Sequence, residues 1–355
     1  MSGPIMSGPP PERERSTSAA PAGTGPRPKN RRGHRRDEHQ MVPDASFTSY
    51  YGRPIVKASP WEADIPAYLF LGGLAAGSSM LAAGADLTGR PGLRRVGRLA
   101  AIAAISGSLI ALVHDLGRPS RLLNMLRVIK VTSPMSVGTW IVSAYAPLVY
   151  LAGADEVMTM QSNWSRRVPR RLRRLSGWTG RSAGLGAALI APAVATYTGV
   201  LLADTATPSW NAARHDLPLL FGASAAAASA GMGLLCAPLA EAGPARRLAL
   251  GAAIAELAVE RRMEAAMGMT AEPLHQGRAG QLMTAARALT IVGGLGSLAA
   301  RRSRIVASLS GVALLAGSAC TRFGVFHAGQ ASARDPKYTV VPQRETMART
   351  GRPGA

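Results

Sequence analysis

Long apolar stretches alternate with short polar connectors through most of the chain. A helix needs about 20 mostly apolar residues to cross the hydrocarbon core of a bilayer. Such stretches, some of them shorter than this, lie at about residues 65–87, 96–116, 137–154, 183–203, 217–240, 245–259, 281–300 and 305–322. Helices are expected, because backbone groups in lipid must find hydrogen-bond partners within their own segment. The pattern therefore predicts an all-α integral membrane protein with eight transmembrane helices.

The chain is polar outside these stretches. Residues 1–45 are rich in Pro, Gly, Ser and Arg, which predicts a disordered basic tail. Residues 46–330 are expected to form the membrane domain, and residues 331–355 a C-terminal tail. Within the membrane domain, the sixth stretch is short and carries Glu256, and the seventh contains Arg287.

The composition agrees with helices packed in a bilayer. Apolar residues make up 47% of the 355 residues but aromatic residues only 5%, so small residues and Leu fill most of the stretches. Small residues let membrane helices approach closely, and membrane lipid is the expected surrounding. The net charge of +21 would suit a nucleic-acid-binding protein. However, Arg clusters at the edges of the apolar stretches, where it directs topology, so no nucleic-acid partner is expected.

The connectors of the two faces differ in kind. Lys and Arg are more numerous after odd-numbered stretches than after even-numbered ones, which places the odd connectors in the cytoplasm. Both termini and the even connectors then lie on the outer face of the cell membrane. This outer face carries SYYGRPIVKASPWEADIPAY, HDLGRPSRLLNMLRVIKVTSPMS, DTATPSWNAARHDLP and FHAGQASARDP. A face so dense in Trp, Tyr, Asp, His, Pro and Gly is expected to bind or dock another molecule.

The second stretch ends on ionisable residues. His114 and Asp115 lie in its last turn, and Arg118 follows before Pro119 stops the helix. Ionisable groups at that depth are costly unless they are paired or used. The next segment, LLNMLRVIKV, separates apolar positions with basic ones, which predicts a short helix lying on the membrane surface. A groove under such a helix could admit a lipid-soluble ligand from the bilayer.

Other polar residues lie in the first and fourth stretches. Glu62, Asp64 and Tyr68 fall within two helical turns, so one pocket can hold all three. The alternative is a simple preference for acids at a helix N-terminus. Tyr197 lies inside the fourth stretch, close to Asp204. A buried tyrosine hydroxyl usually needs a partner, although an interfacial tyrosine is the alternative.

An acidic residue within a membrane helix is a functional candidate, often as a proton relay. We regard Glu256, one turn before Glu260, as such a candidate, together with Asp204. The alternative for Glu256 is a structural ion pair with Arg287.

Cysteine and histidine limit the redox groups that this chain can hold. Cys236 and Cys320 are the only cysteines, whereas an iron–sulfur cluster takes four thiolates. They also give no structural zinc motif. None of the six histidines lies in the middle of an apolar stretch, so no haem is expected.

Several motifs together resemble the NrfD/polysulfide reductase (PsrC-like) family of integral membrane subunits. They are SYYGRP, WEADIPAYLFLGGLAAGS, DLGRPSRLLNML, SPMSVGTW, YTGVLL followed by PSWN, and AGQASARDP. The resemblance implies an eight-helix subunit without haem that exchanges electrons between a quinone, menaquinone or ubiquinone, and a ferredoxin-like four-cluster iron–sulfur subunit. It also implies a molybdopterin catalytic subunit in the same complex. Family members place the quinone headgroup near the positions of Tyr68 and Tyr197, although some have His in the first-stretch region that here offers Ile65 and Tyr68.

The leading hypothesis is a quinone-reactive membrane subunit that contains no catalytic centre of its own. Its predicted quinone-binding residues are Tyr68, Glu62, Asp64, His114, Asp115, Arg118 and Tyr197. Two alternatives stay open, a secondary transporter and a purely structural membrane anchor. A transporter is expected to place its charged groups near mid-bilayer, whereas most polar residues here crowd one face.

Overall fold

The computed structural model describes residues 54–118, 120–127, 129–160 and 169–350. Within these ranges the regular structure is helical and no strand is present. The predicted disordered tail, residues 1–45, lies outside the described residues.

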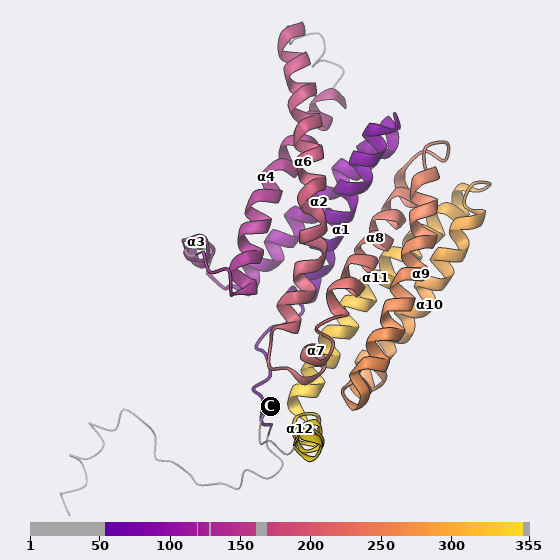
Figure 1. The fold of residues 1–355 in the computed structure, drawn as a ribbon. Helices are drawn as coiled ribbons and strands as arrows, with labels where there is room; N and C mark the ends of the chain where they lie inside the picture. Colours follow the sequence, from indigo (N-terminus) through magenta and orange to yellow (C-terminus); the bar gives the residue numbers. More distant parts are fainter. Residues whose placement is uncertain (1–53, 119, 128, 161–168, 351–355) are drawn as a thin grey trace, which may run out of the picture. The chain divides into compact units, whose positions relative to one another are not determined.

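The helices follow the apolar pattern of the sequence (Figure 1). They are α1 (Asp64–Leu87), α2 (Pro91–Asp115), α3 (Ser120–Leu126), α4 (Pro134–Met160), α6 (Arg170–Ala203), α7 (Pro208–Ala212), α8 (Leu217–Cys236), α9 (Gly243–Met267), the 3-10 helix η2 (Gly268–His275), α10 (Gly277–Ala299), α11 (Arg304–Arg334) and α12 (Lys337–Thr350).

Among the described residues, seven helices are long and apolar enough to cross a membrane: α1, α2, α4, the Gly177–Ala203 part of α6, α8, α10 and α11. They confirm the prediction of an all-α integral membrane protein and account for seven of the eight predicted stretches. The remaining stretch, 245–259, lies within α9, which has 25 residues. Its Arg and Glu residues lower its apolar character and leave it outside the group of seven.

Several boundaries differ clearly from the expectation. The fourth stretch was expected to start at 183, but α6 begins at Arg170. The eighth stretch was expected to end at 322, but α11 continues to Arg334. The helix continues because Arg322 is fully buried against other helices and does not face lipid or water. Residues 331–355 were expected to be a tail, yet they contain the end of α11 and all of α12.

One end of the bundle collects the motifs recognised in the sequence, and we call it the motif end. Here the start of α1 meets the end of α2, since His114 Nδ1 lies 2.8 Å from Asp64 Oδ2. The end of α11 reaches the same place, because Gln330 Nε2 donates to the carbonyl of Ser59 at 2.9 Å. The segment after α9 is also here, where Ser209 Oγ of α7 donates to the carbonyl of Thr270.

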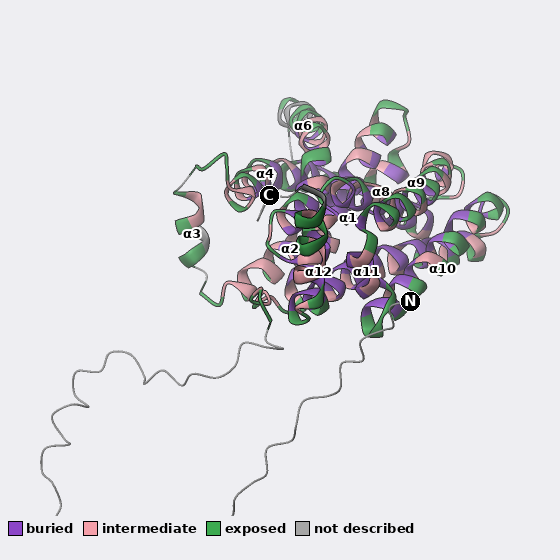
Figure 2. Cartoon of the chain, turned by 60° about the horizontal axis from the view of Figure 1, so that its bottom comes forward, coloured by how far each residue is buried: buried purple, intermediate pink, exposed green. Residues whose placement is uncertain are grey.

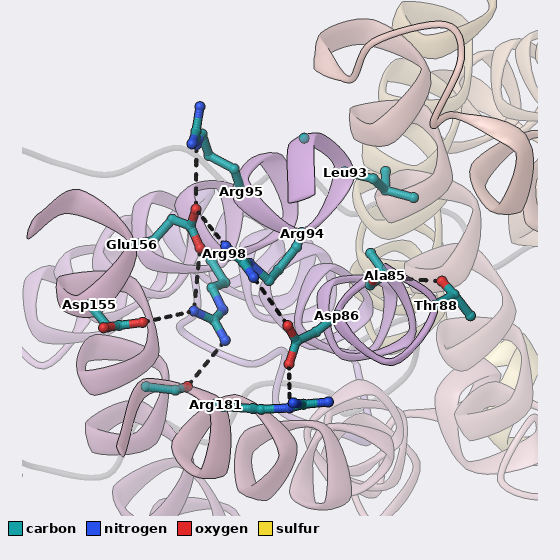
Figure 3. A network of polar contacts seen from close by, with 12 residues as sticks. Ala85, Asp86, Thr88, Leu93, Arg94, Arg95, Arg98, Asp155, Glu156 and Arg181 are labelled. Atoms are coloured by element: carbon teal, nitrogen blue, oxygen red, sulfur yellow. Dashed lines mark hydrogen bonds and ion pairs between the residues drawn. The ribbon is translucent and has the colours of Figure 1, made fainter. Parts of the chain in front are cut away.

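The other end is rich in arginine, and we call it the arginine end. Arg98 of α2 donates to both Asp155 and Glu156 of α4 at 3.3 Å, and Arg94 reaches Glu156 as well (Figure 3). The start of α9 lies at this end too, because Glu241 Oε2 accepts from the backbone N–H of Gly92 at 2.7 Å. The segments before and after α9 therefore lie at opposite ends of the bundle, and α9 runs between them, as the seven apolar helices do.

Small residues permit close helix packing in the interior. α8 and α11 cross at Gly231 and Gly311, where a Cβ on either glycine would lie within 2.7 Å of the other's carbonyl oxygen. α1 is the most enclosed of the seven apolar helices and packs against α2, α6 and α8. Figure 2 shows the result, with buried positions where the helices face one another and exposed positions on their outer sides.

Candidate functional site

An apolar cavity of about 440 Å³ opens at the motif end between α1, α2, α3, α4 and α6. Its lining residues are Trp61, Ile65, Tyr68, Leu109, Leu112, Asp115, Leu116, Met125, Leu126, Met135, Thr139, Val142, Ser143, Ala146, Pro147, Tyr197 and Leu201. Ligand pockets of about 300 to 1,000 Å³ with an apolar lining and a few polar groups are typical of small-molecule sites. The cavity is therefore the strongest candidate for a binding site in the part of the chain described.

Two tyrosines supply the main polar feature of the cavity wall. Tyr68 of α1 is 6% exposed and Tyr197 of α6 is 9% exposed, and their hydroxyl groups contact each other. Each hydroxyl carries one proton, and their mutual hydrogen bond uses only one of the two. The second O–H is left to donate to an acceptor in the cavity. The pair therefore provides one free hydroxyl donor on the wall of a mostly apolar cavity.

Gly138 of α4 sets the position of the Tyr197 ring. A Cβ at residue 138 would lie 2.3 Å from Cε2 of Tyr197, far inside van der Waals contact. The glycine of the SPMSVGTW motif thus lets the ring lie flat against the α4 backbone. On the other side, Ser108 Oγ of α2 donates to the Tyr68 carbonyl at 3.1 Å and ties α1 to α2 near the cavity.

The mouth of the cavity is shaped by the end of α2 and by α3. Gly117 has a φ of +69°, a conformation that suits glycine and ends α2 after Asp115. A helix is present where the short surface helix was predicted, but α3 covers only Ser120–Leu126, and its location on a membrane surface stays a prediction. Met125 and Leu126 of α3 line the cavity. Asp115 adds a carboxylate to the lining.

The structure brings only part of the predicted site together. Tyr68, Asp115 and Tyr197 line the cavity, whereas His114, 79% exposed, pairs with Asp64 on the outside. The side chains of His114 and Asp115 leave the end of α2 in different directions, and only that of Asp115 reaches the cavity.

Three further predicted residues lie outside the cavity. Arg118 and Asp204 are exposed at the motif end. Glu62 lines an open groove beside Arg278 and His327, so Glu62, Asp64 and Tyr68 occupy three different places and share no pocket.

An aromatic cluster that sequence reasoning missed adjoins the cavity through Trp61. Trp61 stacks on Trp210 at 6.1 Å between ring centroids, and Trp210 packs on Phe326 at 5.7 Å. Trp210 is buried and donates from Nε1 to the Val325 carbonyl at 2.9 Å. The cluster joins the start of α1 to α7 and α11, so Trp61 has a structural partner beyond the interfacial belt expected from its sequence position.

Glu256 lies away from the cavity, on α9. Its Oε1 accepts a hydrogen bond from Thr321 Oγ1 of α11 at 2.8 Å. The alternative of an ion pair between Glu256 and Arg287 is wrong, because Arg287 pairs with Glu260 and Glu264. Arg287 lies further towards the motif end than Glu256, since it meets the two later turns of α9.

Metal-ligating groups are sparse in the ranges that the structure describes. No group of three or more His, Cys, Asp or Glu there is arranged to hold a metal ion. Cys236 and Cys320 are both free thiols.

Comparison with known proteins gives one match. The model of the polysulphide reductase NrfD family matches residues 55–269, which is more than half of the chain. No curated protein matches it. The matched range begins before Trp61 and includes α1 to α9, and therefore the whole cavity. The chain belongs to the polysulphide reductase NrfD family of membrane proteins.

Proposed function

We propose that this chain is the membrane subunit of a multi-subunit oxidoreductase that exchanges electrons between the quinone pool and an iron–sulfur partner subunit. The observation that carries the proposal is the apolar cavity with its Tyr68–Tyr197 hydroxyl pair. Membership of the NrfD family supports it, because such proteins are membrane subunits of redox complexes that interact with quinone. A molybdopterin catalytic subunit and the iron–sulfur subunit, as the family normally has them, are proposed as partners.

The residues of the cavity fit a quinone headgroup. An apolar space of about 440 Å³ lies in the size range of small-molecule sites and suits a ring without charge. The free O–H of the tyrosine pair can donate to one carbonyl oxygen of the ring. Thr139 and Ser143 of α4 also line the cavity, but their hydroxyls donate to α4 carbonyls, so they offer acceptor oxygens only. Menaquinone and ubiquinone both meet these requirements.

The chain's own residues would bind and orient the ring and move protons. Bound quinol supplies two electrons and two protons on oxidation. Asp115 lies on the cavity wall at the end of α2, so its carboxylate can accept a proton and pass it to solvent. With two cysteines this chain cannot build an iron–sulfur cluster, and the electrons need an acceptor on a partner.

The membrane arrangement is part of the proposal. We propose that α9 crosses the bilayer as an eighth span, since the segments before and after it lie at opposite ends of the bundle. Its Glu256 and Glu260 are buried inside the protein, which removes their contact with lipid. Eight spans put both termini on the same side of the cell membrane, and the arginine end then faces the cytoplasm.

Substitution of the tyrosines tests the proposal. Replacement of both Tyr68 and Tyr197 by Phe removes the free donor of the pair, since either tyrosine alone would keep one unused O–H. The double variant should weaken quinone binding about tenfold, the effect of one hydrogen bond of about 1.4 kcal/mol. Tyr145→Phe is the matched control, because Tyr145 is equally buried and its hydroxyl pairs with Ser79 away from the cavity. Quinone-analogue binding to the chain in nanodiscs, and quinol oxidation by the assembled complex, are the two readouts.

The outcomes separate the alternatives. A structural anchor would keep quinol-linked electron flow in the complex when both tyrosines are replaced. A transporter would purify without iron or molybdenum and bind no quinone analogue. The two buried charged residues Glu256 and Arg322 are the observation in favour of a transporter. However, α9 and α11, which carry them, are unbroken helices, whereas transporter sites use interrupted helices.

A further inference from the structure

A stripe of three glutamates runs along one face of α9. Glu256, Glu260 and Glu264 are each four residues apart, which puts successive side chains on the same side about 5 to 6 Å apart at Cβ. Glu256 is 2% exposed, Glu260 is buried, and Glu264 is partly exposed. The stripe therefore leads from the motif end into the interior.

The outer part of the stripe meets α10 and η2. Arg287 of α10 donates from Nε to Glu260 Oε1 at 2.9 Å and also binds Glu264. His275 Nε2 lies 3.7 Å from Glu264 Oε1, and His275 lines an open groove at the motif end. Solvent thus reaches the outermost carboxylate, Glu264, and Arg287 bridges Glu264 and Glu260.

The inner end of the stripe is a buried polar site with unused hydrogen-bonding atoms. Glu256 accepts from Thr321 through Oε1, while its Oε2 is buried and has no partner among the described residues. Ser224 of α8 lies beside it but donates to Ser318. Arg322 is 0% exposed and donates from Nη2 to the Phe221 carbonyl at 2.7 Å, and its Nε and Nη1 are likewise buried without partners.

The buried end of this set offers a place for a proton. Three carboxylates face two guanidinium groups, Arg287 and Arg322, and the imidazole of His275 lies beside the outermost acid, Glu264. At the inner end, Oε2 of Glu256 is buried without a hydrogen-bond partner, which is costly for an ionised carboxylate, and a proton bound there removes that cost. Because successive glutamates are one helical turn apart, a proton can pass between their carboxylates through side-chain motion or one bridging water.

The stripe is separate from the cavity. Arg322 packs against α1 at Gly73, where an added Cβ would lie 3.0 Å from Nη2. Tyr68 is five residues earlier on the same helix, which turns it about 140° away and towards the cavity. α1 therefore stands between the cavity and the buried site.

We propose that Glu264, Glu260 and Glu256 form a proton path from the motif-end surface to a buried proton-binding site at Glu256 and Arg322. Glu264 accepts a proton from solvent and passes it to Glu260, Glu260 passes it to Glu256, where it stays bound, and no electron moves. Arg287 holds the carboxylates of Glu264 and Glu260 in place and competes with the proton for them. This assignment does not depend on quinone binding, so the quinone proposal and the proton path can fail separately.

The test uses the full chain in nanodiscs, without quinone or partner, and infrared spectroscopy of its carboxyl groups. The buffer is stepped between about pH 5 and about pH 9, and from H₂O to D₂O, while the Glu256 signal is followed. Glu256→Gln identifies that signal by removing it. If that variant does not fold, Thr321→Val identifies it instead, because loss of the Thr321 hydrogen bond shifts the carboxyl frequency without a change of charge.

The expected result is a Glu256 signal that follows the step in the wild-type chain and responds at least about tenfold more slowly in Glu260→Gln, a loss of rate equivalent to about 1.4 kcal/mol. Glu272→Gln is the matched control, since Glu272 is an exposed carboxylate at the motif end that pairs with Lys337 off the stripe, and it should leave the rate unchanged. An equal rate in Glu260→Gln and wild type overturns the path. If the Glu256 carboxyl signal changes neither with the pH step nor with the change to D₂O, the proposal of a buried proton-binding site is overturned.

Discussion

Replacement of Gly138 by alanine is a sharp test of the cavity, because one methyl group acts on one tyrosine. The new Cβ would lie 2.3 Å from Cε2, 2.7 Å from Cδ2 and 3.3 Å from Cζ of Tyr197. Ordinary carbon contacts begin near 3.5 Å, so the ring must move by about 1.2 Å. Such a shift separates the Tyr197 hydroxyl from that of Tyr68 and narrows the cavity.

The free-energy terms can be compared. Gly→Ala within a helix favours the helix by about 1 kcal/mol, whereas overpacking a tight interior costs about 1 to 3 kcal/mol. Unfolding stability should therefore fall by at most about 2 kcal/mol. Quinone binding should fall at least about tenfold, because the donor of the tyrosine pair is misplaced. Gly84→Ala in α1 is the matched control, since a Cβ there meets no atom within 4 Å.

Binding of a quinone analogue to nanodisc-embedded protein, together with thermal unfolding, measures both terms. A double-mutant cycle sharpens the result. In a Tyr197→Phe background, Gly138→Ala should weaken binding much less than it does in the wild-type chain, because the hydroxyl is already absent. If Gly138→Ala binds the analogue as tightly as Gly84→Ala, the assignment of the tyrosine pair as headgroup donor is refuted.

Three further predictions concern the two ends of the bundle. Arg98→Ala should lower the stability measured by thermal unfolding by about 3 kcal/mol, because it removes the buried partner of two carboxylates. Arg95 is half-exposed, so Arg95→Ala should cost at most about 1 kcal/mol, and equal losses in the two variants would contradict this prediction. Trp210→Ala should lower the unfolding free energy by about 3 to 5 kcal/mol and increase amide hydrogen exchange at the start of α1. Unchanged exchange at the start of α1 would contradict the structural role of the Trp61–Trp210 contact. The hydrogen bond from Lys337 lowers the pKa of Glu272, so the contribution of this pair to docking α12 is present above the unfolded pKa of 4.5 and is lost as the pH falls through the lowered pKa. Proteolysis of α12 should therefore increase as the pH falls through that range, and in Glu272→Gln the proteolysis rate should not depend on pH there.

Most of the helices could be predicted from the sequence because the apolar pattern and the lipid environment act on the same residues. The stretch predicted at 65–87 became α1 at Asp64–Leu87, with a start that differs by one residue. The pattern was weakest where a charge lies inside a helix. Arg322 suggested an end for the eighth stretch, yet α11 buries it against Phe221, whose ring centroid lies 3.8 Å from the guanidinium carbon. A hydropathy pattern cannot report such a partner, since it comes from another helix.

The candidate site was predicted only in part for a related reason. The apolar pattern predicts the depth of each polar residue along its helix but not its direction around the helix axis. His114 and Asp115 share a turn, yet one faces outwards to Asp64 and the other lines the cavity. The Arg98 network was missed altogether, because arginines at the edge of an apolar stretch were interpreted as topology signals, and their buried partners Asp155 and Glu156 lie on another helix.

The position of α1 connects these observations. Tyr68 on one side of α1 faces an apolar cavity, and Gly73 on another side accommodates the buried Arg322. A bulky helix could not serve both neighbours, since Arg322 needs the space that a Cβ at residue 73 would restrict. The small residues that give this chain its low aromatic content therefore do more than let helices pack. They allow one central helix to separate the apolar cavity from the buried charges of Glu256 and Arg322.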